Sequence, residues 1–317
     1  MKNIYSNILK FNKQNLTKTI YYLKKNQIVA LPTETVYGLA GNAYSYKAVK
    51  KIYKLKKRPK KNPLIIHYLN FNDIKKDVEL APNFKKLYKE FCPGPITFVL
   101  KLKKRSRIVS AARANLNTVA VRFPNNTVAR NVLKKIKFPL AMPSANISSR
   151  ISPINAYDVV DEFKKKIKIV INGGNAKIGL ESTVLDLTVK PKILRPGKIT
   201  KKEIERIIKR KVYYQKKPKL IKAPGGLKKH YSPGIPIFMN AKCAPKKHAF
   251  VTFGMKYKKS INNFNLSRNS NLNMAAKNLY KIFRRIKKLG YKKIYVSNIP
   301  NKKIGIAIND RIKRAAN

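Results

Sequence analysis

Acidic residues are scarce in this 317-residue chain, which has 13 Asp and Glu against 73 Lys and Arg and a formal net charge of +60. A surface this cationic attracts phosphate regardless of base sequence, so one interpretation is a protein that works on nucleic acid. The other is compositional drift toward Lys, Asn, Ile and Tyr, of the kind that AT-rich coding produces. Because basic residues run through every predicted helix, we favour drift as the cause. Weak, salt-sensitive, non-specific nucleic-acid binding follows under either interpretation.

Cysteine and histidine are also few. Cys92 and Cys243 lie far apart with no partner motif, which argues against a disulfide framework and against a zinc site. His67, His230 and His248 are scattered, and no two of them have the spacing of a metal-binding pair. The sequence therefore predicts no dedicated metal site in the protein.

Long apolar runs are missing as well. No stretch approaches the roughly 20 apolar residues that span a bilayer. The stretch 1–27 is polar and rich in lysine, without the apolar core of a signal peptide. We expect a cytoplasmic protein with no membrane partner.

The residues that are present favour a folded α/β protein. Apolar residues make up 44% of the chain, and its length allows two cores, one large and one small. Short runs rich in β-branched residues predict strands at 27–31, 64–69, 96–102, 118–123, 138–142, 167–171, 182–187 and 192–194. Apolar residues spaced three to four apart predict helices at 16–26, 48–57, 83–91, 128–137, 156–166 and 201–211. This alternation indicates a large, twisted, mixed sheet.

The C-terminal part has a different organisation. Residues 213–236 mix Lys, Pro and Gly, which is the composition of a linker, and they include the motif-like His230-Tyr231-Ser232-Pro233. Beyond them, a small α/β, Rossmann-like unit is predicted from strands at 248–253 and 293–296 and helices around 274–289 and 304–315. We predict a large domain over 1–211, a linker over 212–237 that folds over the active site, and a small domain over 238–317.

Two cations stand at the end of a predicted helix. Lys56 and Arg58 are two residues apart, and Pro59 ends the helix. A point charge and a planar fork on one side of a turn could hold a polyphosphate. In a chain this rich in lysine, a solvated helix end explains the pair equally well.

Small polar residues follow the predicted strands. Ser144 and Asn146 come directly after one strand, and Ser152 lies just beyond. Their hydroxyl and amide groups could hydrogen-bond a nucleotide, although Ser and Asn are also ordinary turn residues. Glu34 and Glu181 are notable because acids are so few, and both occupy turns, where a capping role is the simpler explanation.

Eight short blocks in one order resemble the YrdC-like threonylcarbamoyl-AMP synthases. They are Pro32 to Leu39, Lys56 to Arg58, Asn62 to His67, Pro93 to Thr97, Thr118 to Arg122, Pro143 to Asn146, Gly179 to Thr183 and Leu194 to Gly197. The resemblance covers about residues 4 to 208, and looser blocks at 225–233 and 305–311 are similar to the long, two-domain form of the family. Eight blocks in one order make chance a poor explanation.

The resemblance implies the synthesis of threonylcarbamoyl-adenylate and pyrophosphate from L-threonine, bicarbonate and ATP, the first step in forming threonylcarbamoyladenosine in tRNA. It implies a nucleotidyltransferase that supplies a downstream tRNA-modifying transferase complex, with Mg²⁺ accompanying ATP and no dedicated protein ligands for it. The threonine amine captures CO₂ and the carbamate attacks the α-phosphate, so the protein needs to supply positioning and charge stabilisation but no nucleophile.

The resemblance also assigns residues to the two substrates. Lys56 and Arg58 would be catalytic, and ATP would be bound by Lys56, Arg58, Thr118, Ser144, Asn146, Ser152, Arg195 and Tyr231. L-threonine would be bound by Thr33, His67, Arg122 and Ser182. Arg122 is the natural clamp for the amino-acid carboxylate, because a guanidinium binds that group through two hydrogen bonds.

Two other hypotheses stay open at this point. A non-catalytic, basic RNA-binding protein on the same fold would have no reason to keep Thr33, Arg122, Ser182 and Arg195 together, and all four are present. A carbamoyltransferase-type maturation factor would be expected to carry zinc-finger or acylphosphatase-like modules, and the sequence has no cysteine cluster to build the former. The sequence favours the synthase.

Overall fold

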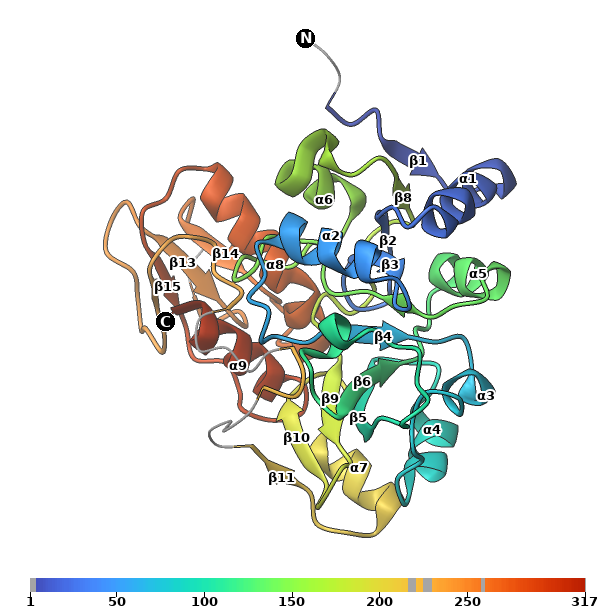
Figure 1. The fold of residues 1–317 in the computed structure, drawn as a ribbon. Helices are drawn as coiled ribbons and strands as arrows, with labels where there is room; N and C mark the ends of the chain where they lie inside the picture. Colours follow the sequence, from blue (N-terminus) through green and yellow to red (C-terminus); the bar gives the residue numbers. More distant parts are fainter. Residues whose placement is uncertain (1–3, 216–220, 225–229, 258–259, 317) are drawn as a thin grey trace.

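Two sheets organise the chain in the computed structural model, which describes residues 4–215, 221–224, 230–257 and 260–316 (Figure 1). Parts of the predicted linker, including its Gly225-Gly226 pair, lie outside the described residues. Within the described ranges, no helix is long and apolar enough to cross a membrane.

The larger sheet has eleven strands in the spatial order β1-β8-β2-β3-β7-β4-β6-β5-β9-β10-β11. Their bounds are β1 Ile8–Lys10, β2 Val29–Leu31, β3 Gly38–Asn42, β4 Ile65–His67, β5 Ile96–Lys101, β6 Thr118–Arg122, β7 Leu140–Ala141, β8 Val170–Asn172, β9 Thr183–Asp186, β10 Lys192–Arg195 and β11 Tyr213–Tyr214. Strand β4 pairs parallel with β6, whereas β5 pairs antiparallel with β6. The predicted mixed sheet is therefore confirmed.

Helices pack on both faces of this sheet around β2. They are α1 Lys13–Lys24, α2 Tyr46–Lys56, α3 Phe71–Ile74, α4 Phe84–Phe91, α5 Thr127–Lys135, α6 Ala156–Phe163 and α7 Lys201–Ile208, with 3₁₀ turns η1 Ser110–Arg113 and η2 Lys164–Lys166. Val29 and Leu31 join an apolar cluster with α1 and α5, and Ala30 joins the main cluster with α2, α4 and α6. Successive strand residues point to opposite faces, which explains this alternation.

Most of these helices begin with an asparagine or serine N-cap. Aspartate can fill the same position, but this chain has few acidic residues. Asn12, Ser45, Asn126 and Asn155 are N-caps whose side chains accept from backbone N–H groups of the first turn. Such caps satisfy donors that have no partner inside the helix.

Several short strands of the described residues were not predicted from the sequence: β1 Ile8–Lys10, β3, β11, β12 Ile237–Phe238 and β14 Asn263–Asn265. Gly38–Asn42 forms β3, although its sequence Gly-Leu-Ala-Gly-Asn lacks the β-branched residues that signal a strand. Gly38 permits a close approach, because a Cβ there would lie 2.4 Å from Met142 Cγ. Tyr213–Tyr214 forms β11 on the edge of the large sheet, so the first residues of the predicted linker are part of that sheet.

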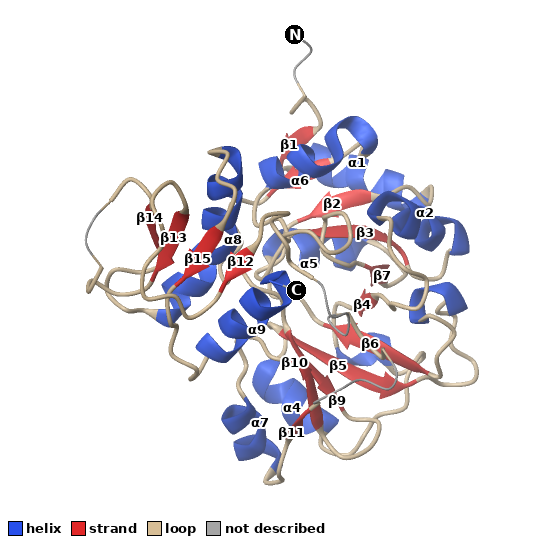
Figure 2. Cartoon of the chain, turned by 90° about the vertical axis from the view of Figure 1, so that its left-hand side faces the viewer, coloured by secondary structure: helices blue, strands red, loops and turns tan. Residues whose placement is uncertain are grey.

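The C-terminal unit has a four-stranded, all-parallel sheet in the order β12-β15-β13-β14 (Figure 2). Its elements are β12 Ile237–Phe238, β13 Ala249–Thr252, β14 Asn263–Asn265, α8 Leu272–Lys288, β15 Ile294–Val296 and α9 Gly305–Ala316. Its apolar cluster also contains residues of the large unit: Val36, Ile151, Ile154, Ala176, Ile178 and Leu180. The two units share this core, and the residue bounds proposed for the domains stay a prediction.

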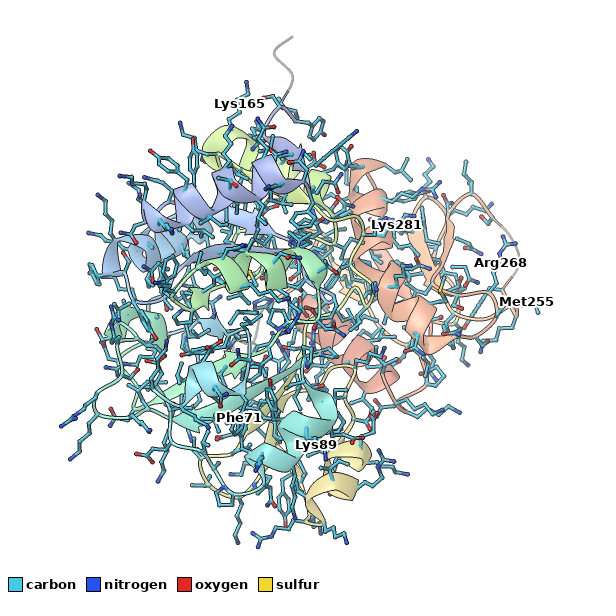
Figure 3. The ribbon with its side chains drawn as sticks, turned by 90° about the vertical axis from the view of Figure 1, so that its right-hand side faces the viewer. Phe71, Lys89, Lys165, Met255, Arg268 and Lys281 are labelled. Atoms are coloured by element: carbon cyan, nitrogen blue, oxygen red, sulfur yellow. The ribbon has the colours of Figure 1, made fainter. Side chains whose placement is uncertain are left out.

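Basic side chains are spread over both units. Lys89 on α4, Lys165 on η2, Lys281 on α8 and Arg268 before α8 lie on widely separated segments (Figure 3). This spread is what compositional drift predicts.

Candidate active site

A cavity lies where the large sheet, the loop after β7 and the linker meet. The predicted site residues that line it are Thr33, Arg58, His67, Arg122, Ser144, Arg195 and Tyr231. Those that do not line it are Lys56, Thr118, Asn146, Ser152 and Ser182. The structure therefore divides the predicted residues into those that line the cavity and those that lie behind its wall, and their assignment to substrates stays a prediction.

Strands β4 and β6 contribute one wall. Ile65 and His67 are two residues apart on β4 and share a face, and His67 lies opposite Arg122 in the β4–β6 register. Burial and the nearby Arg122 charge hold the pKa of His67 well below its usual value. The imidazole is neutral at physiological pH, with Nδ1 3.3 Å from the Ile65 carbonyl oxygen.

The turn after β2 orients Arg122. An Arg122 Nη donates to Glu34 at 2.7 Å, and the Glu34 carboxylate also accepts from the Asn125 backbone N–H at 3.1 Å. The Thr33 hydroxyl shapes the same turn by donating to the Val36 carbonyl at 2.6 Å. The buried Arg122 Nε has no hydrogen-bond partner among the described residues, so it remains available to a ligand.

Arg58 projects into the cavity from a fixed position. Its Nε donates to the Asn62 carbonyl at 2.8 Å, and one Nη donates to Asn62 Oδ1 at 2.7 Å and to the Pro63 carbonyl at 2.8 Å. Burial lowers the pKa of Arg58 to about 10, so the side chain keeps its charge at neutral pH. The acceptors of these three hydrogen bonds are neutral oxygens.

Lys56 supports the wall from behind. Its Nζ donates to the carbonyl oxygens of Ser144 and Asn146, which fixes the loop after β7 against the end of α2. Burial, together with Arg58, lowers its pKa well below the usual value. Lys56 is 1% exposed and Arg58 7%, so the interpretation of this pair as a solvated helix end is wrong.

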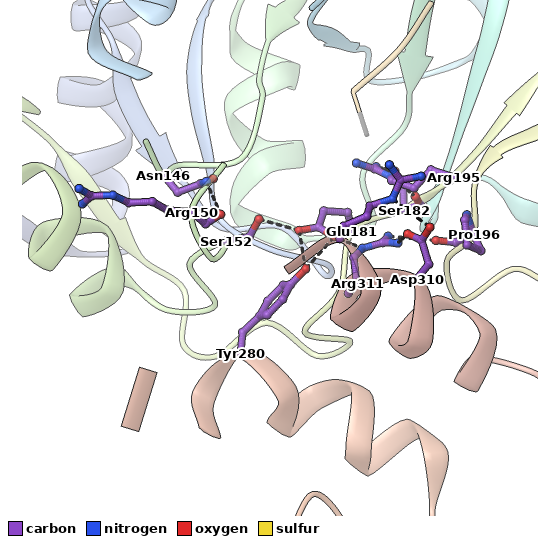
Figure 4. Close-up of polar contacts among 11 residues, drawn as sticks. Asn146, Arg150, Ser152, Glu181, Ser182, Arg195, Pro196, Tyr280, Asp310 and Arg311 are labelled. Atoms are coloured by element: carbon purple, nitrogen blue, oxygen red, sulfur yellow. Dashed lines mark hydrogen bonds and ion pairs between the residues drawn. The ribbon is translucent and has the colours of Figure 1, made fainter. Parts of the chain in front are cut away.

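Three of the predicted polar ligands bond to protein groups instead of lining the cavity: Ser182 and Ser152 contact charged side chains, and Asn146 contacts the backbone. Arg195 donates to the carbonyl and the hydroxyl of Ser182, both at 3.1 Å. The Ser152 hydroxyl donates to Glu181 at 2.6 Å. The Asn146 amide donates to backbone carbonyls of its own loop, and its Oδ1 is buried without a partner among the described residues (Figure 4).

Thr118 and Arg122, two predicted ligands, stand at opposite ends of strand β6. Thr118 begins β6, four residues before Arg122. At about 3.3 Å per residue an extended strand separates the two by about 13 Å. The Thr118 hydroxyl is buried without a partner among the described residues, but Thr118 does not line the cavity.

Residues of the linker close the cavity. Pro224, His230 and Tyr231 line it, and Tyr231 is 0% exposed. His230 Nδ1 and the Tyr231 hydroxyl are buried without partners among the described residues. Burial lowers the pKa of His230 to about 3, so its ring is neutral at physiological pH.

The cavity favours an anion. In the described part of the chain, Arg122 is paired with Glu34 and Glu181 with Arg311, whereas Arg58 and Arg195 have no carboxylate within ion-pair distance. Buried charges without a counter-charge are costly unless a ligand neutralises them. Two such arginines at one cavity are therefore a candidate phosphate site.

The same residues do not form a metal site. No group of three His, Cys, Asp or Glu side chains with metal-binding geometry exists among the described residues. The carboxylate of Glu181 already accepts from Arg311, Ser152 and Tyr280.

Sequence reasoning missed the roles of Glu34, Glu181, His230 and Tyr37. The Tyr37 hydroxyl donates to the Gly174 carbonyl at 2.7 Å and accepts from the Gly173 N–H at 3.1 Å. These bonds join the turn before β3, where Tyr37 lines the cavity, to the turn after β8. The scarcity of acids was the available signal for both glutamates. Pairing with a specific arginine required the fold.

Known proteins resemble this chain over both of its units. Residues 21–197 match the family model described as Telomere recombination, for the Sua5, YciO and YrdC proteins, and residues 199–317 match the model of the threonylcarbamoyl-AMP synthase C-terminal domain. The threonylcarbamoyl-AMP synthase of Pyrococcus abyssi is 33% identical over 93% of this chain and 92% of its own, and that of Bacillus subtilis 32% over 97% and 94%. The structure of P. abyssi Sua5 complexed with L-threonine has a TM-score of 0.88 at 31% identity, covering 98% of this chain and 96% of that one.

Proposed function

The chain belongs to the threonylcarbamoyl-AMP synthase family, and on that premise we propose that it forms threonylcarbamoyl-adenylate and pyrophosphate from L-threonine, bicarbonate and ATP. This reaction makes it a nucleotidyltransferase that acts in the first step of tRNA threonylcarbamoyladenosine formation. The observation that carries the proposal is the pair Arg58 and Arg195, two buried cations at one cavity with no carboxylate partner in the described part of the chain.

The nucleotide phosphates would lie against these two arginines. The reaction replaces the bond from the α-phosphorus to pyrophosphate by one to the carbamate oxygen, so negative charge builds on the leaving group. Preorganised cations stabilise that charge without reorganising at the moment of reaction. Lys56 would act on the same step, because it holds the Ser144 and Asn146 loop and a nearby phosphate would favour its charged form.

Threonine would occupy the wall formed by β4 and β6. Arg122 is held by Glu34 and keeps Nε available for the amino-acid carboxylate. His67 is neutral, so it does not compete with Arg122 for the threonine carboxylate. The threonine amine, once it has lost a proton, attacks CO₂, and the resulting carbamate then faces the phosphate site.

We expect the linker residues to move when ATP binds. Pro224, His230 and Tyr231 line the cavity together with Arg58 and Arg195, and Tyr231 is fully buried there, so these side chains would have to make room for a nucleotide. A segment that withdraws for ATP and returns would exclude water from a hydrolysable adenylate.

The remaining partners follow from this chemistry. Mg²⁺ would arrive with ATP, held by phosphate oxygens, because Glu181 is engaged with Arg311. The adenylate would pass to a downstream transferase complex that modifies tRNA, and a cytoplasmic location is part of the proposal.

The decisive experiment supplies the pure protein with ATP, L-threonine and labelled bicarbonate. We expect a labelled adenylate of the corresponding mass and one pyrophosphate per adenylate. L-valine is the matched control, since it has the same shape without the hydroxyl, and a site that binds the hydroxyl discriminates strongly against it. Absence of the adenylate, or equal use of valine, would contradict the proposal.

A further inference from the structure

Helix α9 of the C-terminal unit inserts an arginine behind the cavity. The side chain of Arg311 is 0% exposed. Its Nε donates to Glu181 at 2.7 Å, one Nη donates to Asp310 at 2.6 Å, and the other donates to the Pro196 carbonyl at 2.9 Å (Figure 4). All three nitrogens of a buried guanidinium are thus engaged, and two of the three acceptors belong to the large unit.

Arg311 also contacts the linker. Its guanidinium carbon lies 4.9 Å from the centre of the Tyr231 ring, which is the geometry of a cation–π interaction. One turn further along α9, the Arg314 carbonyl accepts from the His230 backbone N–H at 2.9 Å. Helix α9 therefore holds both linker residues that line the cavity.

Every large-unit contact of Arg311 is next to a group that faces the phosphate site. Pro196 follows Arg195 directly in the chain, and Glu181 precedes Ser182, which accepts from Arg195. Glu181 itself lines the cavity. The carboxylate is held further by the Tyr280 hydroxyl at 3.1 Å, from helix α8.

We propose that Arg311 is a positioning residue for the nucleotide half of the active site: it fixes Tyr231, the Pro196 carbonyl next to Arg195 and the Glu181 carboxylate, so the C-terminal unit completes the ATP site without touching the chemistry. This inference rests on the proposed function. It assigns to α9 a task in binding ATP. Threonine binding does not depend on this helix, because Glu34, and not Arg311, orients Arg122 in the wall formed by β4 and β6.

Arg311 contacts the ATP side of the cavity but not the threonine wall, and this difference provides the test. Arg311→Met removes the guanidinium, and Arg311→Lys keeps a charge beside Glu181 but loses the planar fork that reaches Pro196 and the Tyr231 ring. Lys313→Met is the matched control, because Lys313 is an exposed cation on the same helix. All variants are full-length chains whose folding is checked by thermal melting.

We expect the KM for ATP to rise about tenfold or more in R311M and several-fold in R311K. The KM for threonine should stay within about twofold of the wild type, because the wall held by Glu34 is untouched. Calorimetric affinity for a non-hydrolysable ATP analogue should fall by the same factors as the KM for ATP rises. K313M should match the wild type in all three measurements.

A merely structural arginine would give a different pattern. Equal increases in both KM values, a fall in kcat with unchanged affinity for the analogue, or unchanged kinetics in a folded variant would each overturn the inference. If R311M does not fold, the kinetics of R311K provide the test, because its lysine still supplies a cation beside the buried Glu181 carboxylate. If the wild type binds the analogue but makes no adenylate, the proposed function fails, and the loss of analogue affinity in R311K still tests Arg311.

Discussion

At the residue scale, the position of each acid determines which buried arginines can bind a ligand. Glu34 neutralises Arg122, and Glu181 neutralises Arg311. Arg58 and Arg195 contact neutral oxygens instead. The uncompensated charge is therefore at the wall where a polyphosphate would lie.

Removing either uncompensated arginine should slow the reaction. For Arg58→Ala and Arg195→Ala we expect adenylate formation to fall at least a hundredfold, since one preorganised charge contact contributes on the order of 3 kcal/mol to the transition state. Initial rates of pyrophosphate release measure this. Lys54→Ala, which removes an exposed cation from α2, is the control. Near-normal rates in both arginine variants would remove them from the site.

His230 gives a prediction for stability against pH. Its pKa is about 3 when folded against 6.5 as the ordinary value, so below 6.5 the unfolded chain binds a proton that the folded chain excludes. Stability is therefore lost as pH falls from 6.5 toward 3, by about 2 kcal/mol at pH ~5 from this group. His230→Gln should lack this loss. Urea unfolding at pH ~7 and ~5 compares the two proteins, and an equal loss in both would show that His230 does not contribute.

At the element scale, the described linker residues Pro224, His230 and Tyr231 line the cavity. Residues 230–232 are held from two sides: His230 by the α9 carbonyl of Arg314, and Ser232 by the Ser149 carbonyl at 2.8 Å. The Tyr231 backbone has a φ of 65°, which is unusual outside glycine and asparagine. Such a conformation persists when its surroundings fix it.

Tyr231 variants test this role. Tyr231→Ala should reduce adenylate formation about tenfold or more, because it removes the ring that covers the cavity and contacts Arg311. Tyr231→Phe keeps the ring and loses only the hydroxyl, so we expect a loss nearer fivefold, the effect of one hydrogen bond to a ligand. Mass detection of the adenylate over time follows both. Wild-type activity in Y231A would make the linker a spacer after all.

At the scale of the whole molecule, the shared apolar cluster makes the two units interdependent. Ile151, Ile178 and Leu180 of the large unit pack with Leu279 and Phe283 of α8. A truncation after residue 221 would expose the first three to water, so it would test solubility as much as activity. Full-length variants are the better test.

We expect the full chain to unfold in a single transition. Phe283→Ala should lower stability by about 3–5 kcal/mol, the usual effect of deleting a buried aromatic ring, and should weaken ATP binding along with it. Met274→Ala, at an exposed position of α8, should change little. Calorimetry of the three proteins measures this. Two separate transitions, with only the smaller one shifted, would mean that the units are independent.

Net charge is also a property of the whole molecule. Because cations are spread over both units (Figure 3), binding to tRNA should weaken steeply as salt rises and should barely distinguish tRNA from an unrelated duplex. Fluorescence anisotropy at several salt concentrations measures both properties. A preference for tRNA that persists at high salt would favour the RNA-binding alternative.

Much of the fold could be predicted because local patterns determine it. Apolar residues three to four apart predicted α4 and α5, and β-branched runs predicted β5 and β6. Strand β3 was missed because Gly38–Asn42 is a strand only through its neighbours β2 and β7. Its partner β7 is distant in sequence, and no β-branched residue of its own signals a strand.

The sequence by itself determined the family and the mixed α/β fold, because short blocks such as Pro143 to Asn146 and the local apolar patterns can be recognised without knowing which residues meet in space. The tertiary structure alone decided which of those residues face the cavity, that Lys56 and Ser182 stand behind it, and that Arg311 reaches Glu181 from 130 positions away. Buried charges acquire their roles from partners brought together by folding, and a sequence records the charges without recording the partners.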